Sequence, residues 1–200
     1  LYTEEIERLT SGEGCDSRLL DPDFWQQFAR GGLTVMDPKL RVLDGSHMAN
    51  NEVCEAQREH LYKRGFLKAD ANGFDWSKAD VDVDAIAATM DALKEDGWPP
   101  VFVYMFDQPW RLCAGMFELM GPILGFEDIE LEASVFGWAL DKPTLDELER
   151  QQTGEDKEWG NFGMPHRDLA FDKCHLKDGT PSVVSVWIPI TDATLDNGCM

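Results

Sequence analysis

Positively charged residues are scarce in this chain of 200 residues. Lys and Arg number 18 against 38 Asp and Glu, which leaves a formal net charge of −20 at pH 7. A surface that binds nucleic acid needs clustered positive charge to meet the phosphates, and so does one that binds an anionic membrane. We therefore expect no nucleic-acid partner and no anionic membrane partner, and interpret the acidic excess as a well-solvated surface.

Long apolar runs and paired cysteines are missing as well. The longest apolar stretches, 101–106 and 119–126, are far shorter than the ~20 residues that span a bilayer. The five cysteines are an odd number at irregular spacing, with no C-x-x-C, which favours free thiols in a reducing compartment. The sequence thus predicts a cytoplasmic protein without a membrane span. Because the chain begins with Leu1 rather than Met, the sequence leaves open that an organelle-targeting segment has been removed.

Several enzyme signatures are absent or incomplete. There is no G-x-S-x-G nucleophile elbow and no glycine-rich dinucleotide fingerprint after a strand. His166-Arg-Asp-Leu also opens the catalytic loop of protein kinases, but that loop needs Asn where this chain has Lys173. A calcium loop starting at Asp80 would need Gly where Ala85 stands. We therefore expect neither a hydrolase of that fold, nor a kinase, nor a calcium loop.

What the chain does contain is enough apolar material for one core. Its composition is 43% hydrophobic and 10% aromatic, which suits a single domain of this length. Asp21-Pro22 supplies an N-cap followed by Pro at the first helical position. We expect Asp84 to cap a second helix and residues 109–120 to form a third, strongly apolar one. Helices should dominate residues 1–125.

Strands are expected mainly in the remainder of the chain, residues 126–200. Residues 129–140 alternate in polarity, and 183–190, rich in Val, Ile and Trp, is the clearest strand. Asn197-Gly198 then predicts a hairpin. Residues 101–105, a short apolar run after two prolines, are also expected to form a buried strand. Helices followed by strands indicate an α+β fold, which we take as one domain over residues 1–200.

His166 and Asp168 are the candidate metal ligands. Residues two apart point to the same face of an extended chain, and Pro165 favours an extended backbone before it. One imidazole and one carboxylate are two of the three ligands of a facial iron site, which leaves positions open for cosubstrate and O₂. Phe171 and other nearby aromatic residues would shield such a site from water. An H-x-D triplet also occurs by chance, in a surface loop where the carboxylate caps local backbone.

Two segments of the sequence resemble one enzyme family. His166-Arg-Asp-Leu, followed by Val-Trp187-Ile-Pro-Ile-Thr-Asp-Ala-Thr-Leu-Asp-Asn-Gly-Cys-Met, is similar to the phytanoyl-CoA dioxygenase family. These are oxygenases that depend on Fe(II) and 2-oxoglutarate. The resemblance implies a double-stranded β-helix (jelly-roll, cupin-like) core with N-terminal and flanking helices. The specific part of the match covers residues ~159–200, and the helical remainder matches loosely.

The resemblance also implies roles for particular residues. His166 and Asp168 would be the catalytic residues that ligate iron. Trp187 would lie near the cosubstrate pocket, and we place Phe171 beside the cosubstrate as well. Arg167 stands where the family often has Gln, and its positive charge would face the anionic 2-oxoglutarate. Related halogenating enzymes lack the carboxylate of Asp168, so its presence favours hydroxylation.

The family's third ligand is a histidine well downstream, and an arginine near it binds 2-oxoglutarate. No histidine follows His175 before Met200. We therefore expect the domain to be C-terminally incomplete in this sequence, with the third ligand and that arginine beyond Met200. The expected reaction is hydroxylation of a small organic substrate, and the acidic balance argues against a phosphate-rich CoA thioester. The alternatives are a catalytically inactive relative that binds a ligand or a protein, and an interaction protein with an accidental H-x-D.

Overall fold

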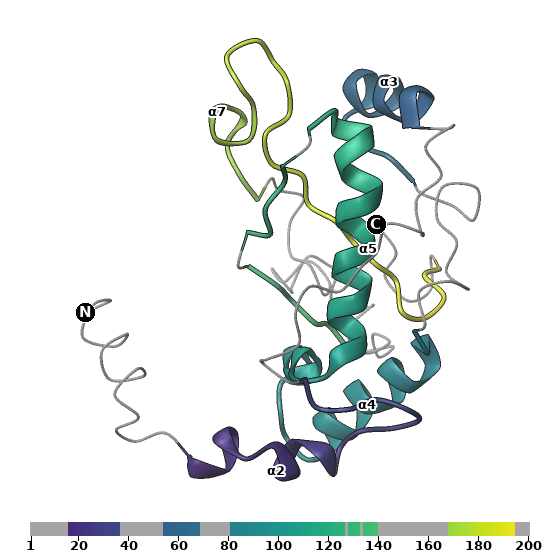
Figure 1. Cartoon of the computed structure of the whole chain (residues 1–200), viewed down its shortest axis with the longest axis vertical. Helices are drawn as coiled ribbons and strands as arrows, with labels where there is room; N and C mark the ends of the chain where they lie inside the picture. The colour runs from purple at the N-terminus through teal and green to yellow at the C-terminus, as the bar shows by residue number, and fades with distance from the viewer. Residues whose placement is uncertain are drawn as a thin grey trace, which may run out of the picture.

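The computed structural model describes residues 16–36, 54–68, 81–126, 128–132, 134–139 and 168–194. Its elements are helical, and in chain order they are η1 (Ser17–Leu20), α2 (Pro22–Gln26), α3 (Cys54–Arg64), α4 (Val83–Glu95), η4 (Pro100–Met105), α5 (Asp107–Leu124) and α7 (Phe171–Cys174). The long helix α5 runs through the middle of the described part, with α3 beside its C-terminal end and α4 near its N-terminal end (Figure 1).

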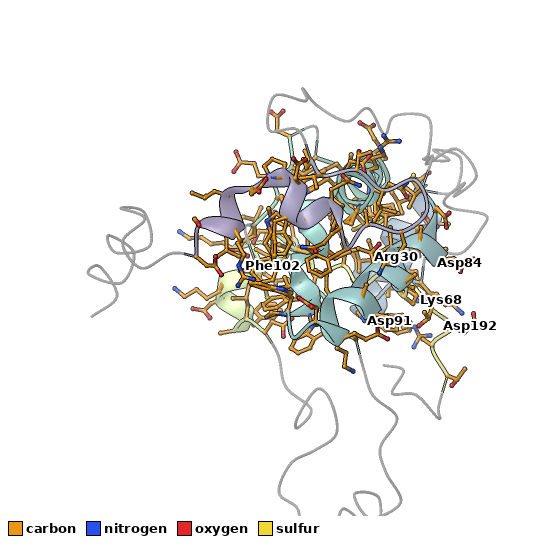
Figure 2. The ribbon with its side chains drawn as sticks, turned by 90° about the horizontal axis from the view of Figure 1, so that it is seen from below. Arg30, Lys68, Asp84, Asp91, Phe102 and Asp192 are labelled. Atoms are coloured by element: carbon orange, nitrogen blue, oxygen red, sulfur yellow. The ribbon has the colours of Figure 1, made fainter. Side chains whose placement is uncertain are left out.

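The larger hydrophobic core is rich in aromatic rings. The indole of Trp25, on α2, is 1% exposed and stacks on Phe102 of η4, with ring centroids 4.9 Å apart and planes 19° apart. Its Nε1 donates a hydrogen bond to the Leu19 carbonyl at 3.0 Å. Phe102 lies among the packed side chains, whereas Asp84 and Asp91 lie on the exposed side of α4 (Figure 2). Trp25 thus joins α2 to η4 within a core that also contains Ile86 and Leu93 of α4.

A smaller core joins α3 to the C-terminal half of α5. Among the described residues its buried members are Cys54 and Leu61 from α3 with Leu119 and Ile123 from α5. Helix α5 ends at Gly125, whose φ of +80° is the left-handed conformation that glycine adopts at little cost. Helix α5 therefore contributes to both cores, since Leu112, near its N-terminal end, belongs to the larger one.

The N-terminal end of α5 is attached to the chain after α2. The backbone N–H of Thr34 donates to Oδ1 of Asp107 at 3.1 Å, and the N–H of Asp107 donates back to the Thr34 carbonyl at 3.0 Å. Asp107 is buried and forms an ion pair with Arg111 at 3.0 Å. A buried carboxylate is tolerated where it is hydrogen-bonded and paired in this way.

Two local predictions are wrong. Residues 101–105 form the 3₁₀ helix η4 and not a strand, because Pro100 begins a turn and Phe102 packs against Trp25 in that conformation. The cap of α4 is Asp82, whose Oδ1 accepts from the N–H of Ala85 at 2.9 Å, and Asp84 lies in the first turn. The predicted cap of α2 is confirmed, since the Asp21 side chain accepts from the N–H of Asp23 at 3.0 Å with Pro22 at the first helical position.

Within the described residues, the two stretches expected to be long strands are extended but do not pair into a sheet. In 128–139 the even-numbered residues are exposed and most of the odd-numbered ones are half-buried, which is the expected alternation. The described residues contain two isolated bridges, Val35 with Phe106 and His175 with Pro181, and no longer strand. The jelly-roll core and the single-domain boundaries stay predictions, since 140–167 and 195–200 lie outside the described residues.

Two further expectations concern membranes and cysteines. No helix in the described ranges combines the length and apolarity needed to cross a bilayer. Of the cysteines in those ranges, Cys54, Cys113 and Cys174 form no disulfide bond. Burial raises the pKa of Cys113, and it also raises the pKa of the neighbouring Tyr104 to about 12. These two groups lie between η4 and α5 and belong to the packing of the molecule.

Candidate active site

The structure describes some of the candidate site residues and not others. His166 and Arg167 lie outside the described residues, together with the predicted hairpin at Asn197-Gly198. Asp168, Phe171 and Trp187 lie within the last described stretch, 168–194. The geometry of the site can therefore be built from the carboxylate and from the extended segment that carries the indole.

A turn brings the two halves of this stretch together. His175 and Pro181 form an antiparallel bridge, and the N–H of Ser182 donates to the Cys174 carbonyl at 2.8 Å. Within the turn, the Thr180 N–H donates to the Asp178 carboxylate at 2.9 Å, and this hydrogen bonding holds the pKa of Asp178 below its usual value. The chain thus reverses direction after α7, as the loop at the upper left of Figure 1 shows.

Asp168 is exposed and is contacted by a side chain on the returning segment. The Ser185 hydroxyl donates a hydrogen bond to Oδ2 of Asp168 at 3.2 Å. Asp168 is not the cap of α7, because the N-cap is Ala170, which makes no side-chain capping bond. The alternative in which this carboxylate caps local backbone in a surface loop stays a hypothesis beside the metal site.

Trp187 lies on the extended segment that reaches Asp168. Ile188 and Ile190 are half-buried and pack against the larger core. Because side chains alternate along an extended chain, Ser185 and Trp187 share the opposite face. The Trp187 side chain is 41% exposed, as expected of a ring that lines an open site and not of one that fills a core.

Phe171 contacts His175 across one turn of α7. Their rings stack with centroids 3.9 Å apart and planes 13° apart. His175 Nδ1 lies 3.1 Å from the Phe171 carbonyl oxygen and 3.2 Å from Sγ of Cys174. This contact orders α7, which follows directly after the candidate ligand.

Ser185 is the residue that the sequence analysis missed. A serine in an apolar run carries no signal by itself. The spacing of two residues from Trp187 is the one feature that places it on the face of the candidate site.

The donor chemistry of Asp168, the one candidate ligand in the described stretch, would suit an iron site. An accessible carboxylate oriented by a hydroxyl donor is a usual form of a metal-binding aspartate. Among the described residues, no group of three or more His, Cys, Asp or Glu side chains is placed to hold a metal ion. The ligand set of His166 and Asp168 therefore stays a prediction.

Comparison with known proteins points to the same segment. The family model of phytanoyl-CoA dioxygenase (PhyH) matches residues 139–200. This segment is PhyH-like. The resemblance based on His166-Arg-Asp-Leu and on the segment around Trp187 is thereby confirmed. No curated protein and no solved structure gives a match to the chain.

Proposed function

We propose that this protein is an Fe(II)- and 2-oxoglutarate-dependent dioxygenase that hydroxylates a small organic substrate. The observation that carries the proposal is the PhyH match, because it spans His166, Asp168 and Trp187 together. Enzymes of this family act on small molecules, and the chemistry of the H-x-D pair suits a facial iron site with open positions.

His166 and Asp168 would hold the iron in this proposal. Bound iron, 2-oxoglutarate and O₂ would supply the oxidation, with hydroxylated substrate, succinate and CO₂ as the products. The protein's own residues bind, orient and exclude water. Arg167 offers positive charge to the anionic cosubstrate, while Trp187 and Phe171 supply apolar surface beside it.

Replacing the carboxylate tests the proposal directly. In the full-length protein, Asp168→Ala should lower succinate formation from 2-oxoglutarate more than ~100-fold, since loss of a ligand should exceed the 10–100-fold typical of a supporting residue. Asp172→Ala is the matched control, because Asp172 is an exposed aspartate on the adjacent α7. Unchanged succinate formation in Asp168→Ala would remove Asp168 from the mechanism. Binding of 2-oxoglutarate without turnover by the wild type would identify an inactive relative.

The substrate class has a test of its own. The net charge of −20 disfavours a CoA thioester, whose phosphates need Lys and Arg clusters. A CoA ester should therefore bind weakly at low salt, and a neutral or cationic small molecule should be preferred. Tight binding of a CoA ester that weakens as salt rises would contradict this part of the proposal.

A further inference from the structure

The Ser185 hydroxyl donates a hydrogen bond to Oδ2 of the candidate ligand Asp168 at 3.2 Å. We propose that Ser185 is a positioning residue that fixes the orientation of the Asp168 carboxylate for metal binding. The inference rests on the proposed function and goes beyond it, because the family resemblance assigns Ser185 no role.

The backbone around Ser185 is held from two sides. Upstream, the Ser182 N–H donates to the Cys174 carbonyl at 2.8 Å and ties the segment to the end of α7. Downstream, Ile188 and Ile190 pack against the larger core. Ser185 therefore lies on a segment anchored at both ends, which is what a group that positions another side chain requires.

Asp168 is exposed, and residues 168–170 lie outside any helix or strand. A side chain in such a position loses rotamer freedom when it binds a metal, and that loss weakens affinity. A hydrogen bond to Oδ2 restricts the carboxylate beforehand. Partners of this kind commonly orient metal-binding carboxylates.

The same hydrogen bond should contribute little to folding. Both residues are exposed, so water replaces the hydroxyl when it is removed. Ser185→Ala should thus leave the melting temperature of the metal-free protein unchanged while it weakens metal binding. A purely structural serine would show the opposite pattern.

The test measures binding of Mn²⁺, a stand-in for Fe²⁺ that does not turn over, to the full-length protein with 2-oxoglutarate present. Free Mn²⁺ is followed by its electron paramagnetic resonance signal. Ser185→Ala should raise the Kd for Mn²⁺ by 10- to 100-fold. Ser185→Thr keeps the hydroxyl and should bind nearly as the wild type does. Ser182→Ala removes a neighbouring exposed hydroxyl as the control and should change nothing.

The outcomes separate this inference from the proposed function. If the wild type binds Mn²⁺, Asp168→Ala abolishes binding and Ser185→Ala matches the wild type, the positioning role is overturned and the proposed function stands. Equal weakening by Ser185→Ala and Ser185→Thr would also overturn it, because the hydroxyl would not be the cause. If the wild type binds no Mn²⁺, or Asp168→Ala binds as well as the wild type, both ideas fail together.

Discussion

At the scale of a single residue, Thr89 shows how one buried hydroxyl joins two segments. It is 0% exposed; its Oγ1 accepts from the Arg30 N–H at 3.0 Å and donates to the Ala85 carbonyl at 2.8 Å. Thr89→Val keeps the shape but leaves that N–H without its acceptor, so the free energy of unfolding should fall by about 1–3 kcal/mol. Urea denaturation measures this fall in the free energy of unfolding. Thr34→Val, at an exposed threonine, is the control, and equal losses in both variants would refute the argument.

At the scale of elements, a guanidinium from α3 supplies hydrogen bonds to the C-terminal carbonyls of α5. Arg58 Nε donates to the Ile123 carbonyl at 2.7 Å, and a second guanidinium nitrogen donates to the Pro122 carbonyl. These carbonyls lie in the last turn of α5, where the helix supplies no partner of its own. The guanidinium thus does for this helix end what a capping side chain does elsewhere.

Arg58→Lys should therefore be far from conservative. An ammonium cannot reproduce the planar fork, so the free energy of unfolding should fall by about 1–3 kcal/mol. The control on the same helix is Lys63→Ala, whose ion pair with Glu59 at 2.5 Å is largely exposed on both sides and should contribute under about 0.5 kcal/mol. Chemical denaturation measures the free energy of unfolding of both variants. A loss in Lys63→Ala as large as that in Arg58→Lys would contradict the capping role of Arg58.

The elements also show which predictions a sequence supports. The start of α2 was predictable because Asp21 and Pro22 act on backbone groups within a few residues. The 3₁₀ helix η4 was not, because its conformation depends on Trp25, far away in the sequence, and on Trp110, whose Nε1 donates to the Tyr104 carbonyl at 2.6 Å. Local signals thus located the starts of α2, α4 and α5 to within two residues. Tertiary aromatic packing decided the conformation of residues 101–105.

The same distinction between local signals and tertiary contacts applies to the candidate site. Asp168 and Trp187 could be selected because a motif and a family resemblance mark them. Ser185 could not, since its contact with Asp168 depends on the turn at His175 and Pro181 that returns the chain. Spacing in the sequence predicts which side chains share one face of a segment. Which residue contacts that face depends on how the chain folds.

At the scale of the whole molecule, the described residues form two cores of unequal size. The larger has ten buried members and the smaller four, and α5 connects them. Helix α3 buries only Cys54 and Leu61, whereas α4 buries six residues. Regions with few buried apolar contacts open at lower free energy than the rest. We therefore predict that α3 detaches from α5 in a partial opening that leaves α4 intact.

Native-state hydrogen exchange with a core variant tests this order of opening. Ile86, 1% exposed on α4, stays packed when α3 opens. Ile86→Val should thus lower the exchange free energy of α4 by about 0.5–1.5 kcal/mol and leave that of α3 unchanged. Leu61→Ala should lower both, because it destabilises the native state relative to the partly open and the unfolded state alike. If Ile86→Val lowers the exchange free energy of α3 as much as that of α4, the two cores unfold as one unit and the partial opening does not exist.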